Sequence, residues 1–114
     1  MDELDGDKNA NLEGARATVD HWSEDDGAVV IQVAGEIDMS NAATVQEAID
    51  QVAEPGAEHL VFDLGQLEFI DSSGLAVLLA VARRVPRVQL RNPSPFLQRV
   101  LEVTGLSATL PTEP

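Results

Sequence analysis

The sequence predicts a single α/β domain in which three main helices pack on a mixed, mostly parallel sheet of four to five strands. Three observations support this fold class. The chain has 114 residues, which suits one compact domain. Its hydrophobic content of 44% is sufficient for a core. Short β-forming runs alternate with stretches of helical periodicity in the order β-β-α-β-α-β-α, with an optional last strand, as is typical of parallel strands joined by helices.

The first two strands are expected to form a hairpin. Residues 15–22 alternate loosely between apolar and polar side chains, and residues 28–34 do so more clearly. The polar segment at 23–27 between them has the residue types of a turn. We therefore expect one antiparallel pair at the edge of a sheet that is otherwise parallel.

A first helix and a buried strand should follow the hairpin. Ser40 is a candidate N-cap, and Pro55 would end the helix. Residues 59–64 are a short apolar run of β-formers that continues at residues 69–70 after a polar interruption, and we interpret it as a buried central strand. The helix is expected to be amphipathic, because apolar residues recur at helical spacing, at Val45, Ala48, Ile49 and Val52.

The second half of the chain should alternate helix, strand and helix. The apolar stretch at 75–82 predicts a helix that is covered on more than one face, and residues 87–91 alternate as a strand. A last helix is expected to follow Ser94 as its N-cap and to end at Gly105. Residues 108–110 are the optional edge strand. The apolar stripe of the last helix is predicted at Phe96, Leu97, Val100 and Leu101.

Charge is distributed unevenly along the sequence. The chain carries 20 acidic and 7 basic residues, a net charge of −13, and residues 1–28 hold nine of the acids and two of the bases. Nucleic-acid binders need clustered basic residues that neutralise phosphates, so we expect no direct nucleic-acid partner. We expect residues 1–14 to form an acidic flexible tail, residues 15–110 the domain, and residues 111–114 a C-terminal tail.

The residue types and patterns that are absent limit the chemistry. The chain has no cysteine, which removes disulfides and thiolate sites, and it shows neither a secretory signal nor a membrane-spanning run. We therefore expect a soluble cytoplasmic protein without a membrane partner. The G-x-S-x-G, G-x-x-x-x-G-K-[ST] and G-x-G-x-x-G patterns are missing, both histidines precede Ser72, and the one lysine is Lys8. We expect no enzyme, no catalytic residue, no metal site and no cofactor.

Five arginines lie within an acid-free stretch that runs from residue 72 to residue 101. They surround the end of the second predicted helix, the fourth strand and the third helix. This region is either a solvated face, a surface for a partner, or a complement to the acidic tail. The five residues are Arg83, Arg84, Arg87, Arg91 and Arg99.

The most informative segment is the step from a strand into the second helix at residues 69–75. It places Ser72 and Ser73 beside the N–H groups of a helix start, where a phosphate would be stabilised. The alternative is that Asp71 or Ser72 caps the helix, and the two roles can coexist. Asp38 follows another strand end, so in a parallel sheet it would approach Asp71 at the same edge. For Asp38 the alternative is a turn or a cap of the first helix.

Four motifs together resemble a known family. In chain order they are Gly35-Glu36-Ile37-Asp38, Leu60-Val61-Phe62-Asp63-Leu64, Phe69-Ile70-Asp71-Ser72-Ser73-Gly74-Leu75, and the segment from Asn92-Pro93-Ser94-Pro95 through Thr104-Gly105-Leu106. Over residues 15–110 the chain resembles the bacterial anti-sigma factor antagonists of the STAS domain family. The Asp-Ser-Ser-Gly-Leu step is the most specific of these motifs.

This resemblance implies a switch protein. Such antagonists bind an anti-sigma factor that is also a serine kinase, and the binding frees the sigma factor. The kinase phosphorylates a serine of the antagonist, the complex separates, and a serine phosphatase of the metal-dependent type resets the switch. By motif match the acceptor is Ser72, with Ser73 as the alternative. The resemblance implies that the environment of the acceptor and the partner-binding surface include Asp38, Asp71, Ser73 and Gly74.

A phosphate would act here through its charge. It carries about −1.5 to −2 charges at neutral pH, next to Asp71 and Asp38. Helix N–H groups can hold it, so we expect local electrostatics at the interface, and not refolding, to separate the partners. The chain is expected to be a monomer or a weak dimer. The alternative function is a scaffold of the same fold, or a transporter-associated interaction module, that is never phosphorylated.

Overall fold

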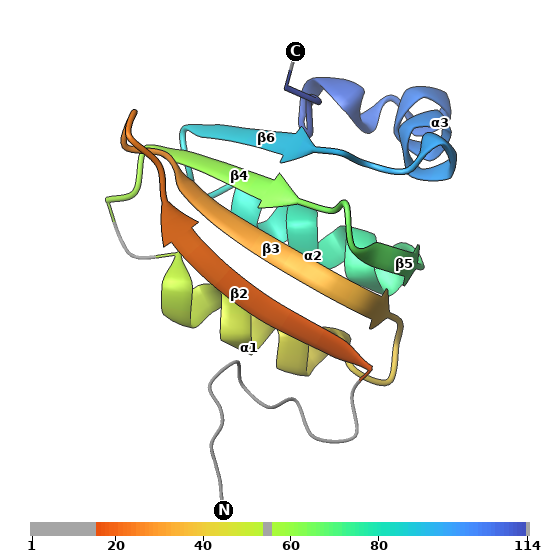
Figure 1. Ribbon diagram of the computed structural model, residues 1–114. Helices are drawn as coiled ribbons and strands as arrows, with labels where there is room; N and C mark the ends of the chain where they lie inside the picture. Colours follow the sequence, from red (N-terminus) through yellow and green to blue (C-terminus); the bar gives the residue numbers. More distant parts are fainter. Residues whose placement is uncertain (1–15, 54–55, 114) are drawn as a thin grey trace, which may run out of the picture.

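A five-stranded mixed sheet organises residues 16–53 and 56–113, the parts of the chain that the computed structural model describes (Figure 1). The strand order is β2-β3-β4-β6, and β5 pairs with the far end of β3. Strands β2 and β3 are antiparallel, and the other pairings are parallel. Helices α1 and α2 cover one face of the sheet, and α3 follows β6 at the end where β5 lies (Figure 1).

The element order confirms the predicted fold class. The predicted acidic tail at 1–14 and the predicted helix stop at Pro55 lie outside the described residues. The described elements are β2 (Ala17–Ser23), β3 (Val29–Ile37), α1 (Ala42–Val52), β4 (His59–Asp63), β5 (Leu67–Ile70), α2 (Ser72–Ala82), β6 (Arg87–Arg91), α3 (Pro95–Thr104) and the 3-10 helix η1 (Leu106–Ala108).

Strand β5 is a separate strand and not a continuation of β4. Strand β3 has nine residues and β4 has five, so β4 pairs only with residues 29–32 of β3. Without another strand, the backbone groups farther along β3 would be unpaired on the side that faces β4. After a turn, β5 fills this place by pairing its residues with Gly35, Glu36 and Ile37. The sheet thereby gains a second parallel strand end beside the end of β3.

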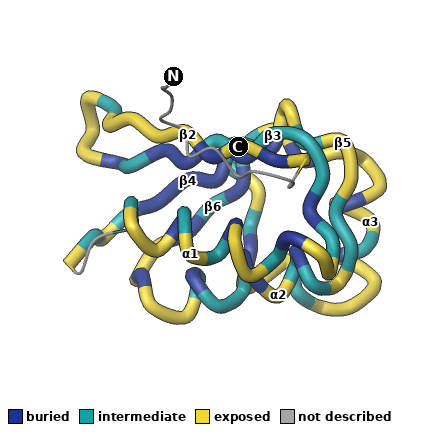
Figure 2. Tube along the Cα trace, turned by 90° about the horizontal axis from the view of Figure 1, so that it is seen from below, coloured by how far each residue is buried: buried dark blue, intermediate teal, exposed yellow. Residues whose placement is uncertain are grey.

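The main core lies between the sheet and the helices α1 and α2 (Figure 2). Leu78 and Val81 of α2 and Ile49 of α1 are buried, together with Ile31 and Phe62 of the central strands. The long apolar stretch of α2 is covered on more than one face, as predicted, because Leu75 and Leu79 also pack partly against the core. The other face of the sheet holds a small buried cluster, formed by Ala28, Val30 and Val61.

The predicted caps of the last helix are confirmed. The hydroxyl of Ser94 accepts a hydrogen bond from the N–H of Leu97 at 3.1 Å, and α3 begins at Pro95. Gly105 follows the helix in the left-handed region with φ 78°, a conformation that favours glycine. These signals are local, so the sequence alone could show them.

The predicted N-cap of the first helix is wrong. The N-cap position of α1 is Asn41 and not Ser40. The Ser40 hydroxyl instead donates to the carboxylate of Asp38. Asn41 is buried, and its side chain accepts from the N–H of Asp38 at 2.9 Å and donates to the carbonyl of Glu36 at 2.8 Å. The side chains of Asp38 and Asn41 thus shape the loop between β3 and α1 and do not cap the helix.

The optional edge strand at 108–110 is also not formed. The chain makes η1 directly after α3, and Leu110 is then fully buried. Pairing with β6 is limited to a bridge between Leu90 and Thr112, partly because Pro111 lacks an N–H group. Leu90 donates to the carbonyl of Pro111 and accepts from the N–H of Glu113, both at 2.8 Å. Residues 111–113, which the sequence assigns to a C-terminal tail, lie against β6.

Candidate functional site

The register of two parallel strands brings Asp38 and Asp71 to the same edge of the sheet. Ile37 at the end of β3 lies opposite Ile70 at the end of β5. Asp38 and Asp71 are the next residues along the two strands, and the N–H of Asp71 donates to the carbonyl of Ile37 at 3.2 Å. The two acids therefore leave neighbouring strand ends, as parallel pairing predicts.

Asp71 caps the helix that carries the two candidate serines. One of its carboxylate oxygens accepts hydrogen bonds from the N–H groups of Ser73 at 2.8 Å and Gly74 at 3.2 Å. A phosphate on Ser72 could use these two donors only by displacing Asp71. That the helix N–H groups hold a phosphate stays a prediction, and two of these donors already bond to Asp71 in the structure.

Ser72 is the more accessible of the two serines. It is the first residue of α2 and is exposed, whereas Ser73 is half-buried. Its hydroxyl makes no hydrogen bond with any other residue that the structure describes. The exposed hydroxyl can be reached by another molecule without any change in the fold.

Gly74 holds this turn against the sheet. A Cβ atom at this position would lie 2.6 Å from Cγ1 of Ile70 and 2.9 Å from Cγ2 of Ile37. Real Cβ atoms essentially never approach side chains so closely, so only glycine allows the first turn of α2 to contact both strand ends. The position of Ser72 relative to the sheet depends on this contact.

The carboxylate of Asp38 is engaged within its own loop. It accepts from the backbone N–H of Ser40 at 2.9 Å and from the Ser40 hydroxyl, and its second oxygen accepts from the guanidinium of Arg16 at 2.9 Å. These contacts hold the pKa of Asp38 below its ordinary value, chiefly through the Ser40 hydroxyl, then the Ser40 N–H and the charge of Arg16. Asp38 is therefore ionised at neutral pH.

Arg16 also belongs to this edge, although no motif in the sequence indicated it. Its Nε donates to Glu36 at 2.8 Å, and hydrogen bonding and charge from Glu36, together with the charge of Asp38, raise the pKa of the guanidinium. The hairpin register pairs Ala17 with Gly35, which places Arg16 next to Glu36. A prediction of this register from the sequence would have placed Arg16 beside Glu36.

Gly35 makes the close approach of Arg16 possible. Its φ is 94°, and a Cβ atom there would lie 2.1 Å from the carbonyl oxygen of Arg16. The same carbonyl accepts the N–H of Glu36 at 2.9 Å, and the pairing of β3 with β5 is irregular at this point. The Gly-Glu-Ile-Asp motif thus bends β3 so that Glu36 and Asp38 meet Arg16.

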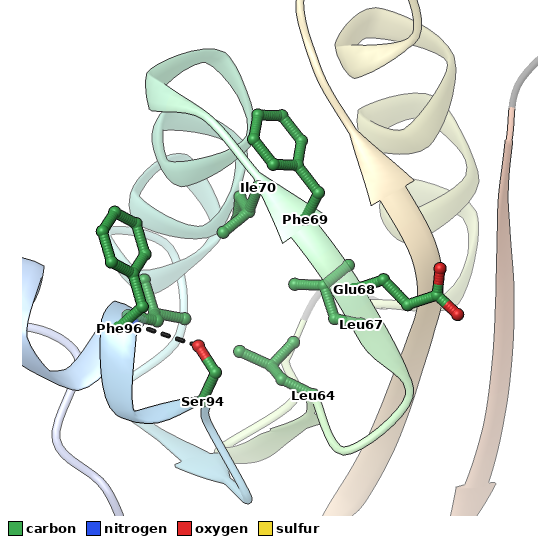
Figure 3. Close-up of a pocket in the computed structure, with 8 residues that line it drawn as sticks. Leu64, Leu67, Glu68, Phe69, Ile70, Ser94 and Phe96 are labelled. Carbon is green, nitrogen blue, oxygen red and sulfur yellow. Dashed lines mark hydrogen bonds between the residues drawn. The ribbon is translucent and has the colours of Figure 1, made fainter.

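An apolar groove runs beside Ser72. One part of it has a volume of about 420 Å³ and a second part about 270 Å³. Figure 3 shows the second part between β5 and α3, with Leu64, Leu67, Ile70 and Phe96 around it and the carboxylate of Glu68 on the other side of β5. The two parts share four lining residues, namely Phe69, Ile70, Phe96 and Leu97.

The exposure of Phe96 differs from the predicted stripe of the last helix. Leu97 and Leu101 are buried as expected, but Phe96 is 72% exposed and Val100 is only half-buried. On β5, Phe69 is 52% exposed. Periodicity identified the apolar residues of α3 but not which of them face solvent.

Two of the five arginines, Arg84 and Arg91, have different surroundings. Arg84 pairs with Asp50 at 2.7 Å, and the two side chains are 49% and 40% exposed. Arg91 is more buried, contacts Glu24 at 2.9 Å and also Glu113, and both contacts raise its pKa.

Among the described residues there is no group of three potential metal-ligating side chains. None of the described helices is long and apolar enough to cross a membrane.

One family model matches the domain. The model described as "Mlab, STAS domain" covers residues 21–112, from within β2 to the segment after η1. Among related sequences, the anti-sigma-F factor antagonist RsfA of Mycobacterium tuberculosis is 32% identical over 105 residues. The match covers 87% of this chain and 80% of RsfA.

Solved structures share the fold. An anti-sigma factor antagonist from Mycobacterium paratuberculosis has a TM-score of 0.76 and 31% identity, over 94% of this chain and 91% of that one. The anti-sigma factor antagonist SpoIIAA has been solved in an unphosphorylated form and, as a Bacillus cell fate determinant, in a phosphorylated form. These two structures have TM-scores of 0.67 and 0.64 at 25% identity, over 85% of this chain and 89% and 92% of SpoIIAA.

Proposed function

This chain belongs to the STAS domain family, and we propose that within it the chain is an anti-sigma factor antagonist. In this proposal the unphosphorylated form binds an anti-sigma factor that is also a serine kinase, and so frees the sigma factor. Phosphorylation of Ser72 abolishes that binding, and a serine phosphatase of the metal-dependent type restores it. The protein acts in the cytoplasm by binding and not as an enzyme.

The observation that carries the proposal is the placement of Ser72. It is exposed at the first position of α2, in a turn that Asp71 caps and Gly74 holds against the sheet. Its hydroxyl oxygen can take the γ-phosphoryl group of ATP, the new O–P bond forming as the bond to ADP breaks and the hydroxyl proton leaves. SpoIIAA, which shares the fold, is known in a phosphorylated form. Ser73 remains the alternative acceptor, although its half-burial favours Ser72.

The geometry also supports an electrostatic mechanism. The carboxylate of Asp71 already accepts from the N–H groups of Ser73 and Gly74, and Asp38 is ionised nearby. A phosphate on Ser72 would add about −1.5 to −2 charges beside these acids, with two of the helix N–H donors already occupied. The added charge would therefore face the partner, and the domain would keep its fold.

The test is phosphorylation of the full chain with ATP and each anti-sigma factor kinase of the source organism. We expect one phosphate by intact mass, located on Ser72 by fragmentation, and none on a Ser72→Ala variant. Ser73→Ala, the matched control in the same turn, should still accept one phosphate. If no kinase modifies or binds the chain, a scaffold that is never phosphorylated becomes the better description.

A further inference from the structure

The groove beside Ser72 presents aromatic side chains from two elements to solvent. Phe69 of β5 is 52% exposed, and Phe96 of α3 is 72% exposed. Both line the two parts of the groove, whose other lining residues are mostly aliphatic. Large exposed aromatic residues in a concave apolar surface are typical of the anchor points of protein interfaces.

The groove and the proposed acceptor share one wall. Ser72 and Asp71 line the larger part of the groove, opposite Phe96 and Val100 of α3. A kinase that transfers a phosphoryl group to Ser72 must bring its own surface against this wall. The apolar surface next to Ser72 is therefore covered by the same partner at the moment of transfer.

We propose that this groove, between β5, α2 and α3, receives an apolar segment of the anti-sigma factor kinase, and that a phosphate on Ser72 prevents this segment from docking. The inference rests on the proposed function. An amphipathic helix that lays its apolar face between Phe69 and Phe96 is the occupant that suits such a groove. Residues 1–15 of this chain do not suit it, because five of them are acidic and only two are leucine.

Desolvation explains why the phosphate is effective. Covering the Ser72 hydroxyl with an apolar side chain costs far less than covering a charged group, because an uncharged hydroxyl is hydrated more weakly than an ion. A phosphate dianion at the same place would lose much of its hydration, and the N–H groups of Ser73 and Gly74 already bond to Asp71. The segment would then be excluded from the groove even though the groove itself is unchanged.

The experiment measures the affinity of the full chain for the kinase that phosphorylates it, without ATP, by calorimetry. Phe96→Ser should weaken binding about tenfold or more, as expected for an interface anchor. Val103→Ser is the matched control, because Val103 is 74% exposed on the same helix but does not line the groove. This control should stay within about twofold of the wild type, as is usual for contacts outside an interface core.

A double-mutant cycle links the groove to the switch. Ser72→Asp should weaken binding strongly in the wild type and in Val103→Ser, but much less in Phe96→Ser, where the docking contact is already lost. If Phe96→Ser binds like the wild type while Ser72→Asp still prevents binding, the groove is not the docking site and the proposed function stands.

Two other results would also overturn the inference. If Phe96→Ser leaves the kinase affinity unchanged but converts a dimer into a monomer in sedimentation, the groove is covered by a second copy. If no kinase binds or phosphorylates the wild type, the proposed function fails, and this inference fails with it. The three outcomes are distinguished by the wild-type control and the sedimentation measurement.

Discussion

Two groups of charged residues lie at different places on the sheet and use their carboxylates differently. Arg91, at the end of β6, contacts Glu24 from the turn between β2 and β3 and Glu113 from the C-terminal segment. At the Ser72 edge, Asp38 and Asp71 accept mainly from N–H and hydroxyl groups of their own loops. The first group joins segments that are distant in the chain, and the second shapes two adjacent turns.

The difference shows which region is available to another molecule. The side chain of Arg91 is only 25% exposed, and its guanidinium has two carboxylate partners, so it has little capacity left for a new contact. Beside Asp71, the Ser72 hydroxyl and the ring of Phe96 are exposed. Because Asp38 and Asp71 bond mainly within their own loops, they can fix the two turns while the adjacent surface stays accessible to another molecule.

The largest expected effect is at Ser72. Ser72→Asp should weaken binding to the proposed kinase partner by at least about 100-fold, because a carboxylate replaces a neutral hydroxyl at the proposed interface. Calorimetry on the full chain measures this, and circular dichroism should show that the fold is unchanged. Equal affinities of the variant and the wild type would contradict the electrostatic mechanism.

The next effect concerns the bend that brings Arg16 to the Ser72 edge. Gly35→Ala should lower the free energy of unfolding by about 3 kcal/mol, because it combines a positive φ with a clash against backbone. Gly27→Ala is the control, since Gly27 has φ 89° but nothing within 4 Å of its added Cβ. That variant should lose only about 1 kcal/mol. Urea denaturation separates them, and equal losses would mean that the close approach to Arg16 is unimportant.

A smaller effect is expected for the contacts of Arg91 with Glu24 and Glu113. Arg91→Met should lower the free energy of unfolding by about 1–2 kcal/mol, because two partly buried carboxylates lose their partner. Arg84→Met, which breaks one exposed pair with Asp50, should change it by less than about 0.5 kcal/mol. Neither substitution should alter kinase binding. A loss of binding in Arg91→Met would show that this region is also part of the interface.

The smallest effect is a pH dependence at Asp38. Its folded pKa lies below its ordinary value, so its ionised form stabilises the fold above that ordinary value, about pH 4, and this contribution is lost as the pH falls through the folded pKa. Asp38→Asn should therefore be slightly less stable than the wild type at pH 7, and the difference should close at low pH. Urea denaturation at several pH values measures it. A difference that does not depend on pH would contradict the role of the charge.

Several features could be predicted from the sequence because their signals are local. The Ser94 cap and the Gly105 stop of α3 depend on residues within one or two turns of each other. The turn into α2 could be recognised in the same way, and Asp71 is its cap. Ser40 has the residue type of a helix cap, but its hydroxyl donates to the carboxylate of Asp38. The side chain of Asn41 accepts from the backbone N–H of Asp38 in the same loop. Local patterns do not rank such competing hydrogen bonds.

The α/β class, the helices and the turn at the Asp-Ser-Ser-Gly motif could be predicted from the sequence, because periodicity and helix caps involve residues only a few positions apart. By contrast, the pairing of β5 with β3 and the contact of Arg91 with Glu24, a partner 67 residues away in the chain, depend on tertiary packing. Tertiary packing also decides that Phe96 faces a groove while its neighbour Leu97 is buried. Burial depends on which element packs against each face, and that contact forms between residues far apart in the sequence.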